Sequence, residues 1–561
     1  MTNYSHIWLI CLLLLPLMCH GDIEPTMPDC EQGGLQGSQY ICLATETQPY
    51  RTAYHFQPAK NWMNGNAFTN FTYGSIILAY IIFCDVVLAD VLLLYNPSGA
   101  VWIQNISWGH STSTDLVNWT PQPIAMWPSH AGDINGCFSG SATILPGEVP
   151  AMLYTGINSK NEQVQNLALP KDLSDPYLIE WVKSQHNPLM IPGSQNNIYG
   201  ELFRDPSTAW LGNDGHWRVA IGITRNRTGV AIIYKSKDFI HWTMDVEQQL
   251  HSTKDTGMWE CVDFFPVATS SLNGLDTSTT GYGTRHVLKS SMYDIQYDYY
   301  TIGIYDTDKD IFMPDMDFPS DNSGLRFDYG RFYASKTFYD SSTNRRILWG
   351  WVKETTDTAT DIMKGWSGLQ AIPRSIWLDE SGKQLVQWPI TEIEKLRMNE
   401  VNLHNELLKG DSVLEVHGIT CSQADVEVSF AVANFENAEI LDPSWTDPQM
   451  ICSQKGASVK GGIGPFGLDY LLSTSTQKIR NPTYGAFLDI NPVNEELTLR
   501  SLVDHSIVES FGGRGKTSMT ARIYPTLAVE SVAHLYAFNN GMESVKISTL
   551  SAWSMKTAQI G

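Results

Sequence analysis

The chain has 561 residues, carries a formal net charge of −22, and contains 17% charged and 11% aromatic residues. One hydrophobic core rarely extends over this length, so we expect two domains. Because no basic run interrupts the acidic balance, nucleic acids and anionic membrane surfaces are disfavoured as partners, and a neutral substrate is favoured. The 18 Trp and 24 Tyr are typical of a large β-rich protein.

Residues 1–21 are predicted to be a secretory signal peptide. Ile7 to Cys19 form an apolar core that is too short to span a bilayer, and the small residue Gly21 follows it. A buried helix is the alternative. If the chain enters the secretory pathway, Asn105, Asn118 and Asn226 become glycosylation acceptors, since each begins an Asn-X-Ser/Thr triplet.

The cysteine pattern argues against a metal site. Of the nine cysteines, Cys11 and Cys19 lie in the predicted signal peptide, and the other seven include no Cys-X-X-Cys pair. A structural zinc site is therefore disfavoured, and we expect neither a metal nor another cofactor. The odd number outside the signal peptide implies at least one free thiol. Cys421 and Cys452 are a candidate pair that sequence alone does not prove.

Residues 50–390 are predicted to form an all-β domain. Short apolar runs rich in β-branched and aromatic residues alternate with turn residues, and helical periodicity does not persist. Sheet of this extent without helices suggests radial repetition in a β-propeller. Residues 391–410 read as a linker, and residues 411–561 as a β-sandwich, because stretches such as Asp425 to Phe430 alternate cleanly between polar and apolar residues.

Residues 65–94 do not match their surroundings. Ser75 to Leu94 is a nearly continuous apolar run of transmembrane length, yet it contains Asp85 and Asp90, which are costly in a bilayer. Three interpretations stand: a membrane helix, a distorted pair of core strands, or sequence that is not native to the fold. We favour the last, because the run begins just after Asn64 and Gly65, where a motif also breaks.

Several motifs follow one another along the chain: Tyr54–Asn64, Tyr95–Trp102, Trp108–Ser111, Ser139–Thr143, Phe203–Pro206, Trp259–Cys261, Asp328–Thr337 and Asp504–Gly512. Together they resemble the plant acid invertases and fructan exohydrolases of glycoside hydrolase family 32. The resemblance implies a five-bladed β-propeller followed by a C-terminal β-sandwich. It also implies retaining hydrolysis of terminal non-reducing β-D-fructofuranosides, such as sucrose or fructans. A proteinaceous invertase inhibitor is then a further partner.

Retaining glycosidases place two carboxyl groups about 5 Å apart across the scissile bond. By resemblance, Glu260 is the acid/base, and Asp205 stabilises the transition state with Arg204 beside it. Asp328 and Arg331 correspond to a charged pair that holds the glucose half of sucrose, which favours an invertase over an exohydrolase. The remaining predicted substrate-binding residues are Asn64, Trp62, Trp102 and Ser139.

The chain also departs from the family pattern. After Asn64 the family continues Asp-Pro-Asn-Gly, and that Asp is the nucleophile, whereas here Gly65 follows directly. A skipped mini-exon with translated intron explains both this gap and residues 65–94. Asp85 or Asp90 is a poor substitute, because catalysis tolerates little misplacement. Two hypotheses follow: an active β-fructofuranosidase, or an impaired member that retains at most sugar binding. For this chain we predict little or no sucrase activity.

Two further features bear on stability and location. Between Leu472 and Pro482 the chain is shorter than the family pattern, so the sandwich is expected to lack one or two strands and a cysteine partner for Cys452. The acidic balance and Val262 favour vacuolar relatives, while the short leader and Trp366 to Gln370 favour the cell-wall group. We predict secretion to the apoplast or cell wall, with the vacuole as the alternative.

Overall fold

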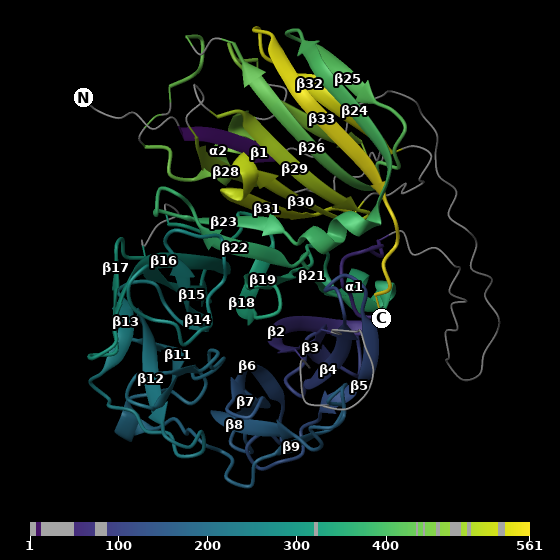
Figure 1. Cartoon of the computed structure of the whole chain (residues 1–561). Helices are drawn as coiled ribbons and strands as arrows, with labels where there is room; N and C mark the ends of the chain where they lie inside the picture. Colours follow the sequence, from purple (N-terminus) through teal and green to yellow (C-terminus); the bar gives the residue numbers. More distant parts are fainter. Residues whose placement is uncertain are drawn as a thin grey trace, which may run out of the picture.

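The computed structural model describes residues 7–12, 50–72, 87–318, 324–433, 436–440, 442, 444–455, 460–471, 484–490, 495–524 and 533–560. A ring of sheets lies below a two-layered β domain (Figure 1). Helices are few and short among these residues: α1 (Thr358–Lys364), α2 (Pro448–Lys455) and the 3₁₀ turns η1 (Ser194–Asn196), η2 (Thr391–Leu396) and η3 (Gly513–Gly515). None of the described helices is both long and apolar enough to cross a membrane. The all-β prediction is confirmed.

Five sheets, here named blades I to V, form the propeller. Blade I contains β20 (Trp366–Ser367), β2 (Asn61–Thr72), β3 (Val87–Asn96), β4 (Ser107–Ser113) and β5 (Thr120–Met126). Blade II contains β6 (Cys137–Leu145), β7 (Val149–Ile157), β8 (Gln163–Pro170) and β9 (Trp181–Lys183). Blade III contains β10 (Trp210–Leu211), β11 (Trp217–Arg225), β12 (Thr228–Ser236) and β13 (Gln249–Thr253).

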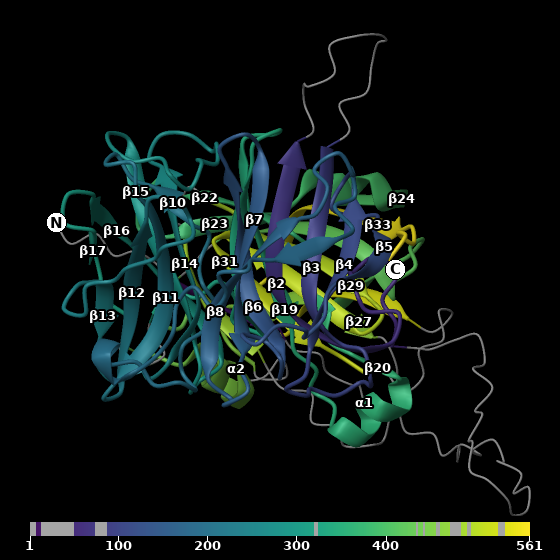
Figure 2. The same cartoon turned by 90° about the horizontal axis from the view of Figure 1, so that it is seen from below.

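Blade IV contains β14 (Trp259–Ala268), β15 (Thr284–Met292), β16 (Tyr297–Asp306) and β17 (Ile311–Pro314). Blade V contains β18 (Phe332–Asp340), β19 (Arg345–Val352), β21 (Leu369–Gln370), β22 (Arg374–Leu378) and β23 (Leu385–Pro389). The ring closes where β20, which follows blade V strands in sequence, pairs in parallel with the start of β2. Helix α1 lies at this end of the propeller beside β20 (Figure 2).

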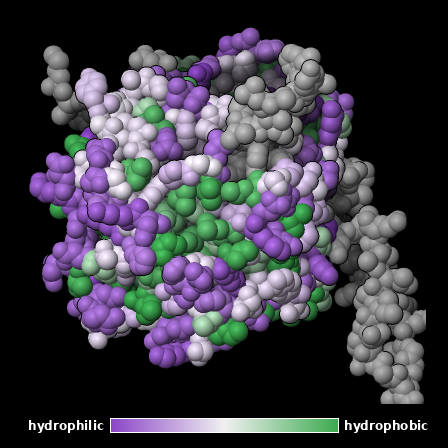
Figure 3. Space-filling model, turned by 60° about the horizontal axis from the view of Figure 1, so that its bottom comes forward, coloured by the Kyte–Doolittle hydropathy of each residue, from purple (hydrophilic) through white to green (hydrophobic). Residues whose placement is uncertain are grey.

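Parts of the segment 65–94, which did not match its surroundings in sequence, form paired strands in blade I. β2 and β3 pair antiparallel from Trp62↔Asn96 to Thr72↔Val87, with a register shift between Asn64 and Ala67. Residues 73–86, with Asp85, lie outside the described residues. The paired strands agree with the interpretation as a distorted strand pair for residues 65–72 and 87–94. The surface of the propeller seen from below is largely polar around an apolar area in its middle (Figure 3).

The second domain is a β-sandwich. Its larger sheet contains β24 (Arg397–Leu408), β33 (Val545–Met555), β26 (Gln423–Val432), β29 (Leu497–Asp504), β30 (Ile507–Gly512) and β31 (Thr517–Arg522). Facing it are β25 (Ser412–Val416), β32 (His534–Asn539) and β27 (Phe466–Leu471). The predicted linker 391–410 includes a strand, because Arg397–Leu408 pairs with β33, and η2 lies between this strand and the last propeller strand, β23. Polar residues on its open face hid this strand in the sequence.

The N-terminal apolar run also contributes a strand among the described residues. β1 (Ile7–Leu12) pairs antiparallel with β28 (Tyr484–Asp489), and this pair forms a sheet of its own. The rest of the predicted signal peptide, and the short segment 472–482, lie outside the described residues. Cys452 is disulfide-bonded, whereas Cys421 is free and buried, so the candidate pair does not form and the expectation that Cys452 lacks a cysteine partner was wrong. The expected free thiols are present at Cys137, Cys261 and Cys421.

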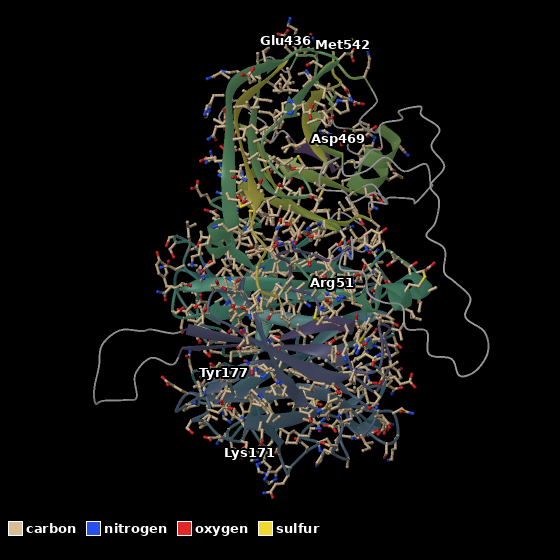
Figure 4. All side chains as sticks on the ribbon, turned by 90° about the vertical axis from the view of Figure 1, so that its right-hand side faces the viewer. Arg51, Lys171, Tyr177, Glu436, Asp469 and Met542 are labelled. Carbon is tan, nitrogen blue, oxygen red and sulfur yellow. The ribbon has the colours of Figure 1, made fainter. Side chains whose placement is uncertain are left out.

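A buried charged network joins the two domains. The Asp504 carboxylate accepts hydrogen bonds from the backbone N–H groups of Ala53, Tyr54 and His55 at 2.6, 2.8 and 2.9 Å. The His55 ring lies between Asp504 and Glu509, at 2.8 and 2.9 Å, and all three side chains have no exposed surface. Figure 4 places Arg51, just before this segment, at the level where sandwich and propeller meet. The β29–β30 hairpin therefore anchors the chain segment that leads into β2.

This network predicts maximal stability at mildly acidic pH. Burial disfavours the imidazolium, but the hydrogen bonds to Asp504 and Glu509 outweigh it and raise the pKa of His55 above 6.5. Burial likewise opposes ionisation of Glu509, but Arg374 and His55 lower its pKa from 4.5 to about 2. The His55 contribution is complete below pH 6.5 and is lost as pH rises through its folded pKa; the Glu509 contribution is complete above pH 4.5 and is lost as pH falls towards 2.

We therefore expect the stability difference between the wild type and His55→Gln to be largest between pH 4.5 and 6.5. Urea unfolding midpoints measured over a pH series check this expectation. A difference that stays constant from acidic to alkaline pH would contradict it.

Candidate active site

The two motif carboxylates lie where inner strands begin in neighbouring blades. Glu260 is the second residue of β14, and Asp205 precedes β10, next to the isolated bridge between Arg204 and Gly222. β14 has a register shift just after Glu260. Asp205 and Cys261 both have positive φ, at 66° and 45°. Left-handed backbone at non-glycine residues costs free energy and is concentrated at functional sites, so this strand edge has the character of one.

Glu260 is held on both carboxylate oxygens. Arg204 donates to Oε1 from Nε at 2.9 Å and from Nη2 at 2.8 Å, and the Tyr333 hydroxyl donates to Oε2 at 2.5 Å. Burial, and next the Glu260 charge, raise the pKa of Tyr333 far above its usual range, so the phenol stays a donor. The Glu260 side chain keeps 15% exposure. It is thus fixed in orientation yet open on one side, as a group that exchanges protons with a substrate must be.

Asp205 is more deeply enclosed. Its Oδ2 accepts hydrogen bonds from the Cys261 backbone N–H at 3.0 Å and from the Cys261 thiol at 3.4 Å. Burial and the Asp205 charge raise the pKa of Cys261 well above its usual range, so the thiol remains protonated. Arg204 Nε lies 3.9 Å from Asp205 Oδ2 and so contacts both acids. The structure therefore brings Asp205, Arg204 and Glu260 together as predicted.

The start of β2 forms another side of the same region, because β2 lies against both β6 and β18. The Trp62 ring packs edge-on against Trp351 with centroids 6.2 Å apart. Gly368 has φ of 86°, and a Cβ there would lie 2.1 Å from the Met63 carbonyl oxygen, so only glycine allows this close approach behind β2. Among the described residues, Asn64 Oδ1 is buried and has no hydrogen-bond partner, which leaves an acceptor at the predicted substrate contact.

The other predicted sugar contacts occupy the neighbouring blades. Trp102 is 55% exposed and packs edge-on against Phe138, so most of its ring is open to solvent. Ser139 is buried on β6, which lies against β2. An exposed indole of this kind provides a flat apolar face for stacking.

A third carboxylate is missing where the nucleophile is expected. Gly65 follows Asn64, and Asn64 pairs with Leu94. Asp90 pairs with Thr69 and lies four residues from Leu94 along β3, a distance of roughly 13 Å at strand rise. The backbone register thus separates Asp90 from Asn64, and its being a poor substitute for the nucleophile stays a prediction. No group of three or more His, Cys, Asp or Glu side chains in the part of the chain that the structure describes is arranged to hold a metal ion.

Four side chains near Glu260 were missed by the sequence analysis. Tyr333 contacts Glu260 directly, Tyr293 stacks under the Arg204 guanidinium at 5.5 Å, and Gln296 reaches the Tyr333 hydroxyl at 3.5 Å. The Lys353 ammonium lies 4.4 Å from the Tyr333 ring centre and 3.1 Å from Gln296 Oε1. Only Tyr333 stood inside a recognised motif. Tyr293 and Gln296 flank the β15–β16 turn, where no local pattern marks function.

The Asp328 side chain lies in the domain interface rather than on an open surface. It has no exposed surface and pairs with Arg374 at 2.9 Å, while Thr520 of the sandwich donates to it from N and Oγ1 at 2.9 and 2.7 Å. Arg331 points its guanidinium to the Glu354 backbone carbonyl at 2.9 Å. These contacts place the Asp328 carboxylate in the interface between the propeller and the sandwich. This placement disfavours Asp328 as a direct sugar contact, whereas the role of Arg331 stays a prediction.

Comparison with known proteins gives matches along both domains. Residues 55–389 match the glycosyl hydrolases family 32 N-terminal domain, and residues 472–554 match the family 32 C-terminal domain. The chain is 50% identical to the fructan 6-exohydrolase of Beta vulgaris over a 594-residue alignment covering 99% of this chain and 95% of that protein. It is 52% identical to the β-fructofuranosidase, insoluble isoenzyme CWINV1, of Arabidopsis thaliana over 551 residues, covering 91% and 92%.

A solved structure is similar over the same extent. Fructan 1-exohydrolase IIa from Cichorium intybus matches with a TM-score of 0.86 and 47% identity, covering 92% of this chain and 99% of that one. The two-domain architecture thus has a counterpart in a solved structure of high identity.

Proposed function

The chain belongs to glycosyl hydrolase family 32, the family of plant β-fructofuranosidases and fructan hydrolases, and from this we propose that it cleaves terminal β-D-fructofuranosyl units with Glu260 as acid/base. The single observation that carries the proposal is the placement of Glu260 between Arg204 and Tyr333, beside Asp205. Such an arrangement suits proton transfer to a leaving oxygen next to a carboxylate that stabilises positive charge.

In this proposal each residue has a separate task. Glu260 protonates the leaving oxygen as the glycosidic bond breaks, and Arg204 and Tyr333 fix its orientation. Asp205 accepts hydrogen bonds from the fructosyl hydroxyls and stabilises the oxocarbenium-like transition state. Asn64, with its open Oδ1, and Ser139 contact the sugar, while Trp62 and Trp102 bound it. Among the described residues none is assigned to attack on the anomeric carbon, so we expect hydrolysis by this chain to be slow.

We propose that the leaving sugar lies over Tyr293, Gln296 and Lys353, the side chains that surround Glu260 and Tyr333. Because the Asp328 side chain is directed to the domain interface, it no longer favours sucrose over fructans as the substrate. Because the similar proteins include both a fructan 6-exohydrolase and a β-fructofuranosidase, both substrate types belong in the assay.

We further propose secretion to the apoplast or cell wall, supported by relatives named as cell-wall or insoluble isoenzymes. Asn105 and Asn226, two of the predicted glycosylation acceptors, are exposed on the described surface. A proteinaceous invertase inhibitor remains a proposed partner. The predicted signal peptide is consistent with this location and is tested by N-terminal sequencing of the secreted protein.

Fructose binding is the direct test of the site. We expect Asp205→Asn to weaken fructose binding by at least about tenfold, because a charged acceptor for sugar hydroxyls is lost. Isothermal titration calorimetry measures the dissociation constant, and Asp308→Asn, a change at an exposed carboxylate remote from the site, is the matched control. Equal affinity in all three proteins would overturn the assignment of the site.

A further inference from the structure

Two fully enclosed lysines lie among the strands that carry the site acids. Lys336 on β18 is 3% exposed, and Lys289 on β15 has no exposed surface. Burying an ammonium group is costly unless its donors are satisfied, so such residues require an explanation. Neither takes part in the mechanism proposed above, and neither contacts Glu260.

Lys336 contacts backbone rather than carboxylate. Its ammonium donates to the carbonyl oxygens of Asp205 at 3.4 Å, Pro206 at 3.2 Å and Val262 at 3.1 Å. The first two belong to blade III and the third to blade IV, while Lys336 itself belongs to blade V. One side chain thus connects three blades at the residues adjoining the site carboxylates.

Lys289 makes the complementary connection. Its ammonium donates to the carbonyl oxygens of Cys261 at 3.1 Å and Ser335 at 2.5 Å, and to the Ser291 hydroxyl at 2.8 Å. The Asp298 carboxylate lies 3.3 Å away and also accepts hydrogen bonds from the Ser335 N–H and hydroxyl. Lys289 therefore joins blade IV to blade V at Ser335, the residue next to Lys336.

The backbone at these contacts has unfavourable geometry. Asp205, Cys261 and Ala334 have φ of 66°, 45° and 53°, one in each of the three blades. β14 and β18 also shift register at these points, between Glu260 and Asp263 and between Tyr333 and Lys336. Such conformations persist only where surrounding contacts enforce them. The two ammonium groups bind carbonyl groups of left-handed residues or of the residues that directly follow one. The carbonyl groups are those of Asp205, Pro206, Cys261, Val262 and Ser335.

We propose that Lys336 and Lys289 are positioning residues, which hold the strained strand starts of blades III, IV and V so that Asp205 and Glu260 keep their relative placement. They act through the backbone and not by contact with the sugar. Loss of one ammonium group releases two or three carbonyl dipoles that face each other, and the left-handed residues then relax towards ordinary backbone. This inference rests on the proposed function only for its effect on sugar binding; its effect on the backbone stands independently.

The test is Lys336→Met in the full chain. Hydrogen exchange measured by mass spectrometry should show faster exchange, by at least about tenfold, in peptides containing the Asp205 and Cys261 amides. The fructose dissociation constant should rise by at least about tenfold, since small displacements of positioned groups are costly. Lys183→Met is the matched control, because Lys183 is also mostly buried and pairs with Asp133 at 2.6 Å in blade II, outside this region.

The outcomes are separable. A folded Lys336→Met protein with site exchange and fructose affinity within about twofold of wild type would overturn the proposal, as would equal effects from Lys183→Met. If Lys336→Met does not fold, Lys336→Gln, whose amide retains two donors, is measured instead with smaller changes expected in the same direction. If wild type binds no fructose but exchange at Asp205 accelerates in the variant, the sugar site fails while the positioning role stands.

Discussion

Insertion of Asp-Pro-Asn between Asn64 and Gly65 is expected to raise kcat/KM for sucrose or a fructan by about a thousandfold or more. The retaining mechanism needs a nucleophilic carboxylate opposite the acid/base, and residual turnover without it depends on the remaining electrostatics and binding. The chain has Glu260 and Asp205 in place but only an amide at Asn64. Release of glucose or fructose by the purified proteins measures the difference.

The position tolerates an insertion, because the β2–β3 ladder is already interrupted between Asn64 and Ala67. Asn-Pro-Asn at the same place is the matched control: it adds the same length without the carboxylate and should leave the rate near that of the original chain. If the original chain already hydrolyses sucrose or fructan as fast as the Asp-Pro-Asn protein, the missing nucleophile is not the limiting feature.

Local patterns predicted much of the fold and part of the site. Short alternating strands and turn residues indicated sheets throughout, and Asp205 and Glu260 were selected because their motifs, Phe203–Pro206 and Trp259–Cys261, resemble those of a known family. Their partners were beyond the reach of local patterns, since Tyr333, which donates to Glu260, lies 73 residues further along the chain. Arg204 is the exception, because it adjoins Asp205 in the first motif and pairs with Glu260.

Long-range contacts limited the remaining predictions. Asp328 and Arg331 are close in sequence, but the side chain of Asp328 is claimed by Thr520, which is 192 residues away. Tyr293 and Gln296 reach the site because the β15–β16 turn projects beside β18, which no sequence periodicity encodes. The predicted linker included β24 because most residues of this strand are exposed and it pairs with the last described strand, β33.

The second large effect is expected on stability, from the buried ion pairs of Arg374. Arg374 has no exposed side-chain surface and is the shared partner of Asp328, at 2.9 Å, and Glu509, at 2.5 Å. Its replacement by Met leaves the buried Asp328 carboxylate without its cation and removes one of the two cationic partners of Glu509, the other being His55. We expect the free energy of unfolding to fall by about 3–5 kcal/mol, the range for breaking a buried ion pair from one side. Urea denaturation at pH 6 measures it.

Arg227→Met is the control for removing an arginine from a carboxylate pair, because Arg227 and its partner Asp255, 3.9 Å away, are 71% and 72% exposed. Its loss should cost about 1 kcal/mol or less. Equal destabilisation by both changes would mean that the Arg374 network adds nothing beyond an ordinary surface pair.

Asp328→Asn, made in the chain carrying the Asp-Pro-Asn insertion, distinguishes a structural role from a substrate contact. Because Thr520 N and Oγ1 and the Gly330 N–H all donate to the Asp328 carboxylate, the amide loses acceptor capacity inside the interface. We therefore expect a lower unfolding midpoint with an unchanged KM for sucrose in the folded protein. A glucose-binding carboxylate would give the opposite result, a higher KM at unchanged stability, and that outcome would return Asp328 to the active site.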